Sequence, residues 1–192
     1  MGSVAQVDAA GSITTNGTVT GAVTQSASLG SQRLQVAAVI GGSPATVDAR
    51  ATLSGAVNQT SSAAFANDQR IAIGAVEGSS GQISTDATVG ATLSQAMSGG
   101  GVSREQLIAI ASVEGTQGTV STRAVVNGSV SQSNQSSQSG QPTNQRIQIG
   151  SVRNSGTLAV RTDVTVTGNL SQSANASSRG QQSILIGGVS AD

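Results

Sequence analysis

The chain has 192 residues, and its nine Arg and nine acidic residues give a formal net charge of zero at pH 7. It contains no Cys, His, Trp, Tyr or Lys, and Phe65 is its only aromatic residue. Globular cores draw much of their buried area from large aromatic side chains, so this composition argues against an ordinary globular core. The usual catalytic bases and most metal ligands are also missing, so we expect no enzyme, no cofactor and no catalytic or metal site.

The rest of the chain is rich in Ser, Thr, Gln, Asn and Gly, a bias that also occurs in disordered proteins. Its apolar residues are mainly Val, Ile, Leu and Ala at regular spacing, which favours pleated strands over disorder. No basic patch with interleaved aromatics exists, so nucleic-acid binding is not expected. No apolar run reaches the length of a membrane span. The first thirty residues contain no apolar core of a secretory signal, so we expect any such signal to have been removed.

Five short stretches of the chain are nearly identical: QRLQVAAV, QRIAIGAV, QLIAIASV, QRIQIGSV and QSILIGGV. They start at Gln32, Gln69, Gln106, Gln145 and Gln182, at spacings of 37, 37, 39 and 37 residues. A fixed period in this range is typical of a repeat architecture, in which each unit buries its apolar face against its neighbours. We therefore expect one repeat domain over residues 1–192, with a half rung at 1–31, rungs at 32–68, 69–105, 106–144 and 145–181, and a closing half rung at 182–192.

Within each unit, the sequence predicts a short strand, a turn rich in Gly and Ser such as EGSSG, and then a longer strand. One face of the longer strand matches in size in all five units; in the first unit it carries Ile13, Thr15, Gly17, Val19, Gly21 and Val23. The period of two predicts that this face is the interior. Its fifth position predicts a corner or a close backbone approach, because it is always small: Gly21, Gly55, Ala91, Gly128 and Gly168. Tight hairpin turns at Asn16-Gly17 and Asn127-Gly128 are the alternative.

A second Gln recurs late in each unit, at Gln25, Gln59, Gln95, Gln132 and Gln172. The distance from the first Gln of a unit to the second is 26 or 27 residues, whereas the distance to the next unit varies from 7 to 13. A constant core and a variable connection are how structure and loop usually divide. If equivalent strands stack in register, both Gln columns form amide ladders along the stack; capping of a polar turn is the alternative.

These features predict an all-β fold: a β-solenoid of about five stacked strand–turn–strand rungs, with parallel in-register strands about 4.8 Å apart. One outward column of the longer strand carries charges that alternate in sign, namely Asn16, Arg50, Asp86, Arg123 and Asp163. In-register stacking places opposite charges next to one another in this column, so we expect a charge ladder along it.

The first unit shows a longer strand without most of its short strand, and the last shows a short strand alone, with no polar cap at either end. An open stack exposes backbone donors and acceptors to pairing. We expect Ile184, Ile186 and Val189 of one subunit to complete the rung that begins in the next subunit with Ile13, Val19 and Val23. Such a heterologous, non-closing contact produces a homopolymeric filament; ends that fray in a monomer are the alternative.

Segments such as TVTGAVTQSAS and LQVAAV, with Gln at recurring positions in imperfect strand–turn–strand repeats, span nearly all of residues 4–189. In these features the chain resembles the fibre subunits of bacterial functional amyloids of the curli and Fap types. The Gln-x-Gly-x-Asn-x-Ala signature of curli repeats and the Cys pair of Fap-type subunits are absent. The resemblance implies a secreted, extracellular cross-β fibre for biofilm matrix or surface attachment, with a dedicated secretion pore and a nucleator as partners.

Two other functions fit the same architecture. A monomeric β-solenoid adhesin or surface stalk would carry binding on longer loops such as SNQSSQSGQPTN. An ice-binding protein would present outward Thr pairs, but only two of the five rungs have the full pair, at Thr18/Thr20 and Thr165/Thr167. The filament is the function that the sequence favours.

Overall fold

The computed structural model describes residues 3–5, 11–28, 30–42, 46–62, 68–98, 104–135, 143–153, 156–175 and 180–190. Within these ranges the regular structure consists of β-strands, and all strand pairs are parallel. Equivalent residues of successive units are partners, for example Gln69 with Gln106 and Asp86 with Arg123. The predicted all-β solenoid with parallel, in-register stacking is therefore confirmed.

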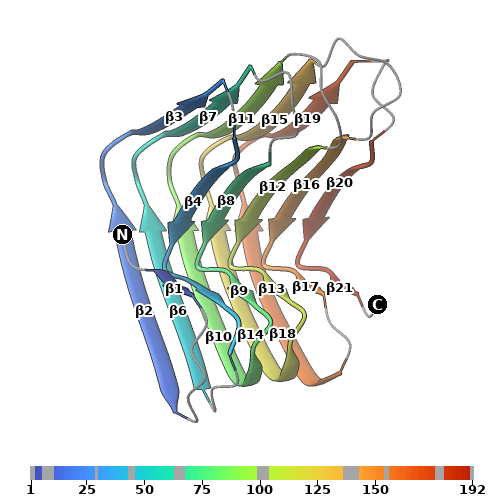
Figure 1. Cartoon of the computed structure of the whole chain (residues 1–192). Coiled ribbons are helices and arrows are strands. Elements are labelled where there is room, and N and C mark those ends of the chain that lie inside the picture. The colour runs from blue at the N-terminus through green and yellow to red at the C-terminus, as the bar shows by residue number, and fades with distance from the viewer. Residues whose placement is uncertain are drawn as a thin grey trace.

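The strands form four sheets, which we name A to D (Figure 1). Sheet A contains β1 (Ser3–Ala5), β5 (Ala38–Ile40), β9 (Val76–Glu77), β13 (Val113–Glu114), β17 (Val152–Arg153) and β21 (Val189–Ser190). Sheet B contains β2 (Ser12–Val19), β6 (Thr46–Leu53), β10 (Ser80–Val89), β14 (Gln117–Val126) and β18 (Thr157–Val166). Sheet C contains β3 (Val23–Ala27), β7 (Val57–Ser61), β11 (Leu93–Ser98), β15 (Val130–Gln135) and β19 (Leu170–Ala174). Sheet D contains β4 (Gln32–Val36), β8 (Gln69–Ile73), β12 (Arg104–Ile110), β16 (Thr143–Ile149) and β20 (Gln182–Ile186).

One coil of the solenoid takes a strand from each sheet in the order D, A, B and C. Four coils are complete: β4–β7, β8–β11, β12–β15 and β16–β19. Strands β1–β3 lie at one end of the stack and strands β20 and β21 at the other (Figure 1). One coil contains about 37 residues, as the spacing of the repeats predicted. The expected number of about five rungs agrees with the four complete coils and two partial ones.

Each of the five similar stretches contains two strands, one in sheet D and one in sheet A, where the sequence predicted a single strand. The chain bends between them at a residue with positive φ, at Ala37 (49°), Gly74 (57°), Ala111 (46°), Gly150 (55°) and Gly187 (58°). Glycine adopts this left-handed conformation without the steric cost that a Cβ brings. The bend directs the chain from sheet D into sheet A, so each coil has four strands.

Inward-facing threonines in sheet B stabilise these corners. Thr85 Oγ1 donates to the carbonyl oxygen of Ala111 at 2.9 Å, and Thr122 Oγ1 donates to that of Gly150 at 2.8 Å. Thr15 and Thr162 make the same bond to Ala37 and Gly187. In each case the hydroxyl reaches the corner of the following coil, so the bond joins two coils. This explains why a polar residue recurs in the interior column.

A second corner separates sheets B and C at the position that the sequence predicted from its small residues. A Cβ at Gly128 would overlap the carbonyl oxygen of Ala91, and a Cβ at Gly168 would overlap that of Gly128. Gly55 approaches the Gly21 carbonyl in the same way. Both the corner and the close backbone approach are confirmed. The alternative of a hairpin is wrong, because Asn16-Gly17 lies within β2, and Asn127-Gly128 joins two strands of different sheets.

The predicted interior face of the longer strand is buried in the first three complete coils and partly buried in the fourth, where β18 and β19 are edge strands. Its residues from sheets B and C pack against sheet D in one apolar core that includes Leu53, Leu93, Ile71, Ile108 and Ile149. A smaller core lies between sheets A and B and includes Val39, Val76, Val47 and Ile83. Since each coil adds the same side chains to both cores, burial is complete only where another coil lies on each side.

Candidate functional site

The two Gln columns lie in sheets C and D and form continuous amide ladders through the interior. In each ladder, Nε2 of one Gln donates to Oε1 of the equivalent Gln in the preceding coil, at 2.5–2.9 Å. The sheet C ladder joins Gln25, Gln59, Gln95, Gln132 and Gln172, and the sheet D ladder joins Gln32, Gln69, Gln106, Gln145 and Gln182. From Gln59 to Gln132 in sheet C and from Gln32 to Gln145 in sheet D the members are buried, with Gln95 only 1% exposed. Gln172, at the end of its ladder, is partly buried.

Each ladder also holds the two sheets together. In sheet C, the amide of Gln95 donates to the backbone oxygen of Leu107 at 3.1 Å, and that of Gln132 donates to Arg146 at 3.0 Å. From sheet D, Gln106 donates to the oxygen of Ser133 at 3.2 Å. Both N–H groups of these amides are therefore used, one along the stack and one across it. A buried amide placed in this way costs little desolvation because its hydrogen bonds are remade.

The ladders are directional. At the first end of the stack, Gln25 Nε2 donates across to the Arg33 oxygen, and its second N–H has no partner among the described residues. At the other end, Gln172 and Gln182 each donate to the coil before them, and their Oε1 atoms accept no bond among the described residues. One end of the stack thus presents amide donors and the other presents amide acceptors.

The predicted charge column is in register, but only part of it forms ion pairs. Arg123 binds Asp86 of the preceding coil at 3.2 Å. Arg50 pairs instead with Asp48 of its own strand, at 2.7 Å. Asp163 is the registered neighbour of Arg123, and no ion pair joins them. The column therefore avoids like-charge neighbours without being a continuous ladder, and its exposed pairs contribute little to stability.

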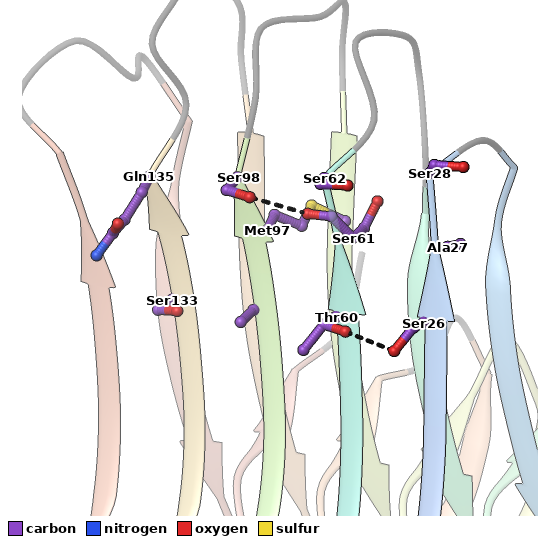
Figure 2. Close-up of a pocket in the computed structure, with 11 residues that line it drawn as sticks. Ser26, Ala27, Ser28, Thr60, Ser61, Ser62, Met97, Ser98, Ser133 and Gln135 are labelled. Carbon is purple, nitrogen blue, oxygen red and sulfur yellow. Dashed lines mark hydrogen bonds between the residues drawn. The ribbon is translucent and has the colours of Figure 1, made fainter.

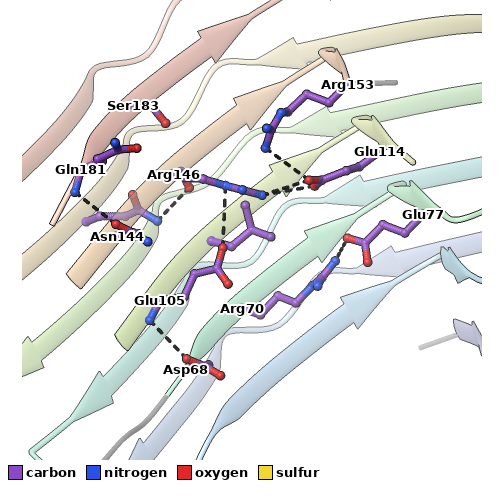
Figure 3. A network of polar contacts seen from close by, with 12 residues as sticks. Asp68, Arg70, Glu77, Glu105, Glu114, Asn144, Arg146, Arg153, Gln181 and Ser183 are labelled. Atoms are coloured by element: carbon purple, nitrogen blue, oxygen red, sulfur yellow. Dashed lines mark hydrogen bonds and ion pairs between the residues drawn. The ribbon is translucent and has the colours of Figure 1, made fainter. Parts of the chain in front are cut away.

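A second charged cluster, which the sequence did not point to, lies where sheets A and D meet (Figure 3). Arg146 bridges Glu105 at 3.7 Å and Glu114 at 3.2 Å, and Arg153 also binds Glu114 at 3.3 Å. Arg70 pairs with Glu77 of its own coil. Burial and, after it, the charge of Arg33 in the neighbouring strand β4 lower the pKa of Arg70. The ion pairs of this cluster offset the repulsion between two pairs of like-charged neighbours in the stack, Arg33 beside Arg70 and Glu77 beside Glu114.

An open groove runs along the C-terminal ends of the sheet C strands β3, β7, β11 and β15 (Figure 2). Hydroxyl side chains line it, and Ser26 and Thr60 are hydrogen-bonded at 3.0 Å. Ser98 Oγ donates to the Ser61 oxygen at 3.5 Å, beside the buried Met97. No charged residue lines the groove as described. Its small hydroxyls continue the polar face of sheet C.

The exposure of the interior apolar side chains changes most at the last, partial coil, β20 and β21. Ile147, Ile149 and Val152 are fully buried, whereas their registered neighbours Ile184, Ile186 and Val189 are 41%, 47% and 59% exposed. The preceding strands β18 and β19 are also edges, and their interior residues Val164, Val166 and Leu170 are partly buried. At the opposite end, Ile13 and Val23 are partly buried, and Val19 is 8% exposed. The predicted assembly residues therefore lie at the two ends of the stack.

The strand order corrects one feature of these ends. The opening residues supply β1 in sheet A in addition to β2 and β3, and the closing residues supply β20 and β21 in sheets D and A. Sheet A therefore contains six strands, and the other three sheets contain five. The two half rungs are not strictly complementary, because both contain a strand of sheet A.

Comparison of the chain with protein-family models, with curated proteins and with solved structures gives no match. The described residues contain no helix long and apolar enough to cross a membrane. They also contain no group of three or more acidic side chains that could hold a metal ion. Two features stand out among the described residues: the two amide ladders and the apolar ends of the stack.

Proposed function

We propose that the protein is the structural subunit of a head-to-tail, amyloid-like β-solenoid filament. One observation carries the proposal: the last coil presents the interior columns of the solenoid, through Ile184, Ile186 and Val189, half-exposed and in the register of the coils before it. The first coil of a second copy carries the same columns. Stacking that coil on this end would bury the exposed apolar side chains, and each Å² of apolar surface removed from water stabilises the contact by about 25 cal/mol.

The direction of the amide ladders supports a head-to-tail joint. With β2 of one copy placed on β18 of another, Gln25 Nε2 faces the free Oε1 of Gln172, and Gln32 faces Gln182. Two copies joined through equivalent ends would place acceptor against acceptor or donor against donor. The heterologous contact therefore completes both ladders, and repetition of a heterologous contact gives a filament rather than a closed dimer.

The outward side chains also fit in this joint. In sheet B, Asp163 meets the uncharged Asn16, and Arg161 meets Thr14. In sheet D, Ser183 meets Arg33. No like-charge pair arises in these two sheets, so electrostatics does not oppose the contact.

We propose a mechanical role outside the cell, in biofilm matrix or surface attachment. The chain's resemblance to secreted fibre subunits, its low charge and its Gln ladders support this assignment, since in-register amide ladders add stability to cross-β stacks. A dedicated secretion pore and a nucleator are the partners that such a subunit would need in addition to its own copies.

Electron microscopy of the purified chain tests the proposal with a matched pair of variants in β20. Ile184→Asp places a charge in the interior column, where the joint would bury it without a partner, and we expect no filaments. Ser183→Asp adds the same charge on the outward face opposite Arg33, and we expect filaments to persist. Far-ultraviolet circular dichroism should show strand content in both variants, because Ile184 is half-exposed in the single subunit.

A variant ending at Gln181 extends the test. It lacks β20 and β21, so its ends cannot complete each other, and we expect no long filaments. If this variant and Ile184→Asp both form filaments like the full chain, assembly uses another surface. If the full chain forms none under any condition tested, the monomeric adhesin or stalk becomes the better assignment.

A further inference from the structure

The surplus strand of sheet A has a consequence for the joint. In a joint that extends sheets B and C without a gap, β2 and β3 of the incoming copy lie on β18 and β19 of the copy before it. The same layer then holds β20 of the earlier copy, which lies next to β4 of the incoming one. Sheet D is also extended without a gap. Sheets B, C and D each continue with five layers per subunit.

In sheet A, the same joint places two strands, one from each copy, at the same position. After the corner at Gly187, the chain leads directly from β20 into β21, which arrives next to β5 of the incoming copy. That place is already held by the incoming copy's own β1, which pairs with β5 through Ser3↔Ala38, Val4↔Val39 and Ala5↔Ile40. One parallel edge accepts only one strand, so one of the two must leave.

We infer that β1 is a guard strand that covers the sheet A edge of the free subunit and is displaced by β21 of the neighbouring copy during assembly. The inference rests on the proposed filament. It assigns to Ser3–Ala5 the role of a competing strand, and to Val189–Ser190 the role of the strand that replaces it. Exposed edges are sites of unwanted pairing, and a short covering strand is one way to protect them.

The connections decide which strand leaves. Only Gly187 and Gly188 lie between β20 and β21, so β21 is held in place once the five residues of β20 pair with β4. Strand β1 is three residues long and, among the described strands, pairs with β5 alone, whereas β2 has its own eight-residue pairing with β6. Loss of β1 therefore leaves the rest of the first coil paired. Replacement of one strand by an equivalent strand of another copy is a known route to assembly.

Assembly kinetics followed by light scattering provide the test. A variant lacking residues 2–5 and the point variant Val4→Pro both weaken β1, since proline cannot donate to the sheet. We expect each to shorten the lag before filaments form by at least about threefold, the effect of losing a single net backbone hydrogen bond. Ser190→Pro weakens the invading strand instead, and we expect it to lengthen the lag.

The outcomes separate this inference from the filament itself. If the full chain assembles and neither β1 variant shortens the lag, the guard role is wrong and the filament stands. If no form of the chain assembles, the filament is wrong and the guard role falls with it. Helical reconstruction gives a second measurement: displacement predicts five layers and a rise of about 24 Å per subunit, whereas stacking of β21 under an intact β1 requires six layers and about 29 Å. A rise of six layers overturns the inference.

Discussion

Replacement of Gln95 by Leu tests whether the amide ladders hold the solenoid together. Gln95 is 1% exposed and makes three hydrogen bonds. It donates to Gln59 Oε1 at 2.8 Å and to the Leu107 oxygen at 3.1 Å, and it accepts from Gln132 Nε2 at 2.8 Å. Leucine has a similar size and supplies none of these bonds, so the change isolates the polar contribution.

The expected loss follows from the atoms that remain. Gln59 Oε1 and one N–H of Gln132 lose their ladder partners in a buried site, and the Leu107 oxygen loses its cross-sheet donor. A buried polar atom left without its partner costs about 1–3 kcal/mol, and leucine regains part of this through its apolar surface. We therefore expect the free energy of unfolding to fall by about 2–5 kcal/mol.

Chemical denaturation followed by circular dichroism, under conditions where the chain is monomeric, measures this loss. Gln172→Leu is the matched control, because Gln172 ends its ladder, accepts no bond among the described residues and is only partly buried. We expect it to cost about 1 kcal/mol. Equal losses in the two variants, or no loss in Gln95→Leu, would refute the view that the buried ladder stabilises the stack.

Three further predictions concern the corners and the filament. Gly128→Ala should lower the free energy of unfolding by about 1–3 kcal/mol in the same denaturation assay, because the new Cβ would overlap the Ala91 carbonyl. Gly21 holds the same position in the first coil and has open space around it, so Gly21→Ala should change the free energy of unfolding by less than about 0.5 kcal/mol. Thr122→Val should cost about 1–3 kcal/mol by removing the donor to the Gly150 oxygen; an unchanged denaturation midpoint would contradict this role. Fibre diffraction of oriented filaments should give a reflection near 4.8 Å along the fibre axis, since strands stack along that axis; its absence would contradict the joint.

Much of the fold could be predicted because the sequence repeats its own structure. In-register stacking makes every unit meet a copy of itself, so a column of like residues in the sequence is also a column in space. For this reason the repeat pattern alone predicted the interior face, the small residues at Gly55 and Gly128, and the register of Arg123 with Asp86. The Gln columns were visible for the same reason.

The D–A corner was missed because its signal is incomplete. Glycine occupies the position of positive φ in three units, at Gly74, Gly150 and Gly187, but alanine occupies it at Ala37 and Ala111. An Ala within an alternating apolar run gives no indication of a bend. The corner is stabilised instead by contacts between coils, such as the bond from Thr85 to Ala111.

The charged residues show a second limit. Register alone places Arg50 beside Asp86, yet Arg50 pairs with Asp48 two residues away on the same face of its strand. Both carboxylates are within reach of a long, flexible and 62% exposed side chain, and its choice depends on rotamers that a sequence pattern does not contain. The cluster around Arg146 depends in the same way on how sheets A and D meet.

The sequence by itself determined the period, the strand type, the inward residues and the columns, because all of these follow from local alternation repeated at a fixed distance. The tertiary structure alone decided the number of sheets, the direction of the amide ladders and the presence of strands from both ends in sheet A. These features depend on where the chain turns and on which edge each strand reaches. Turn geometry and edge pairing are set by contacts between coils, and no single repeat contains them.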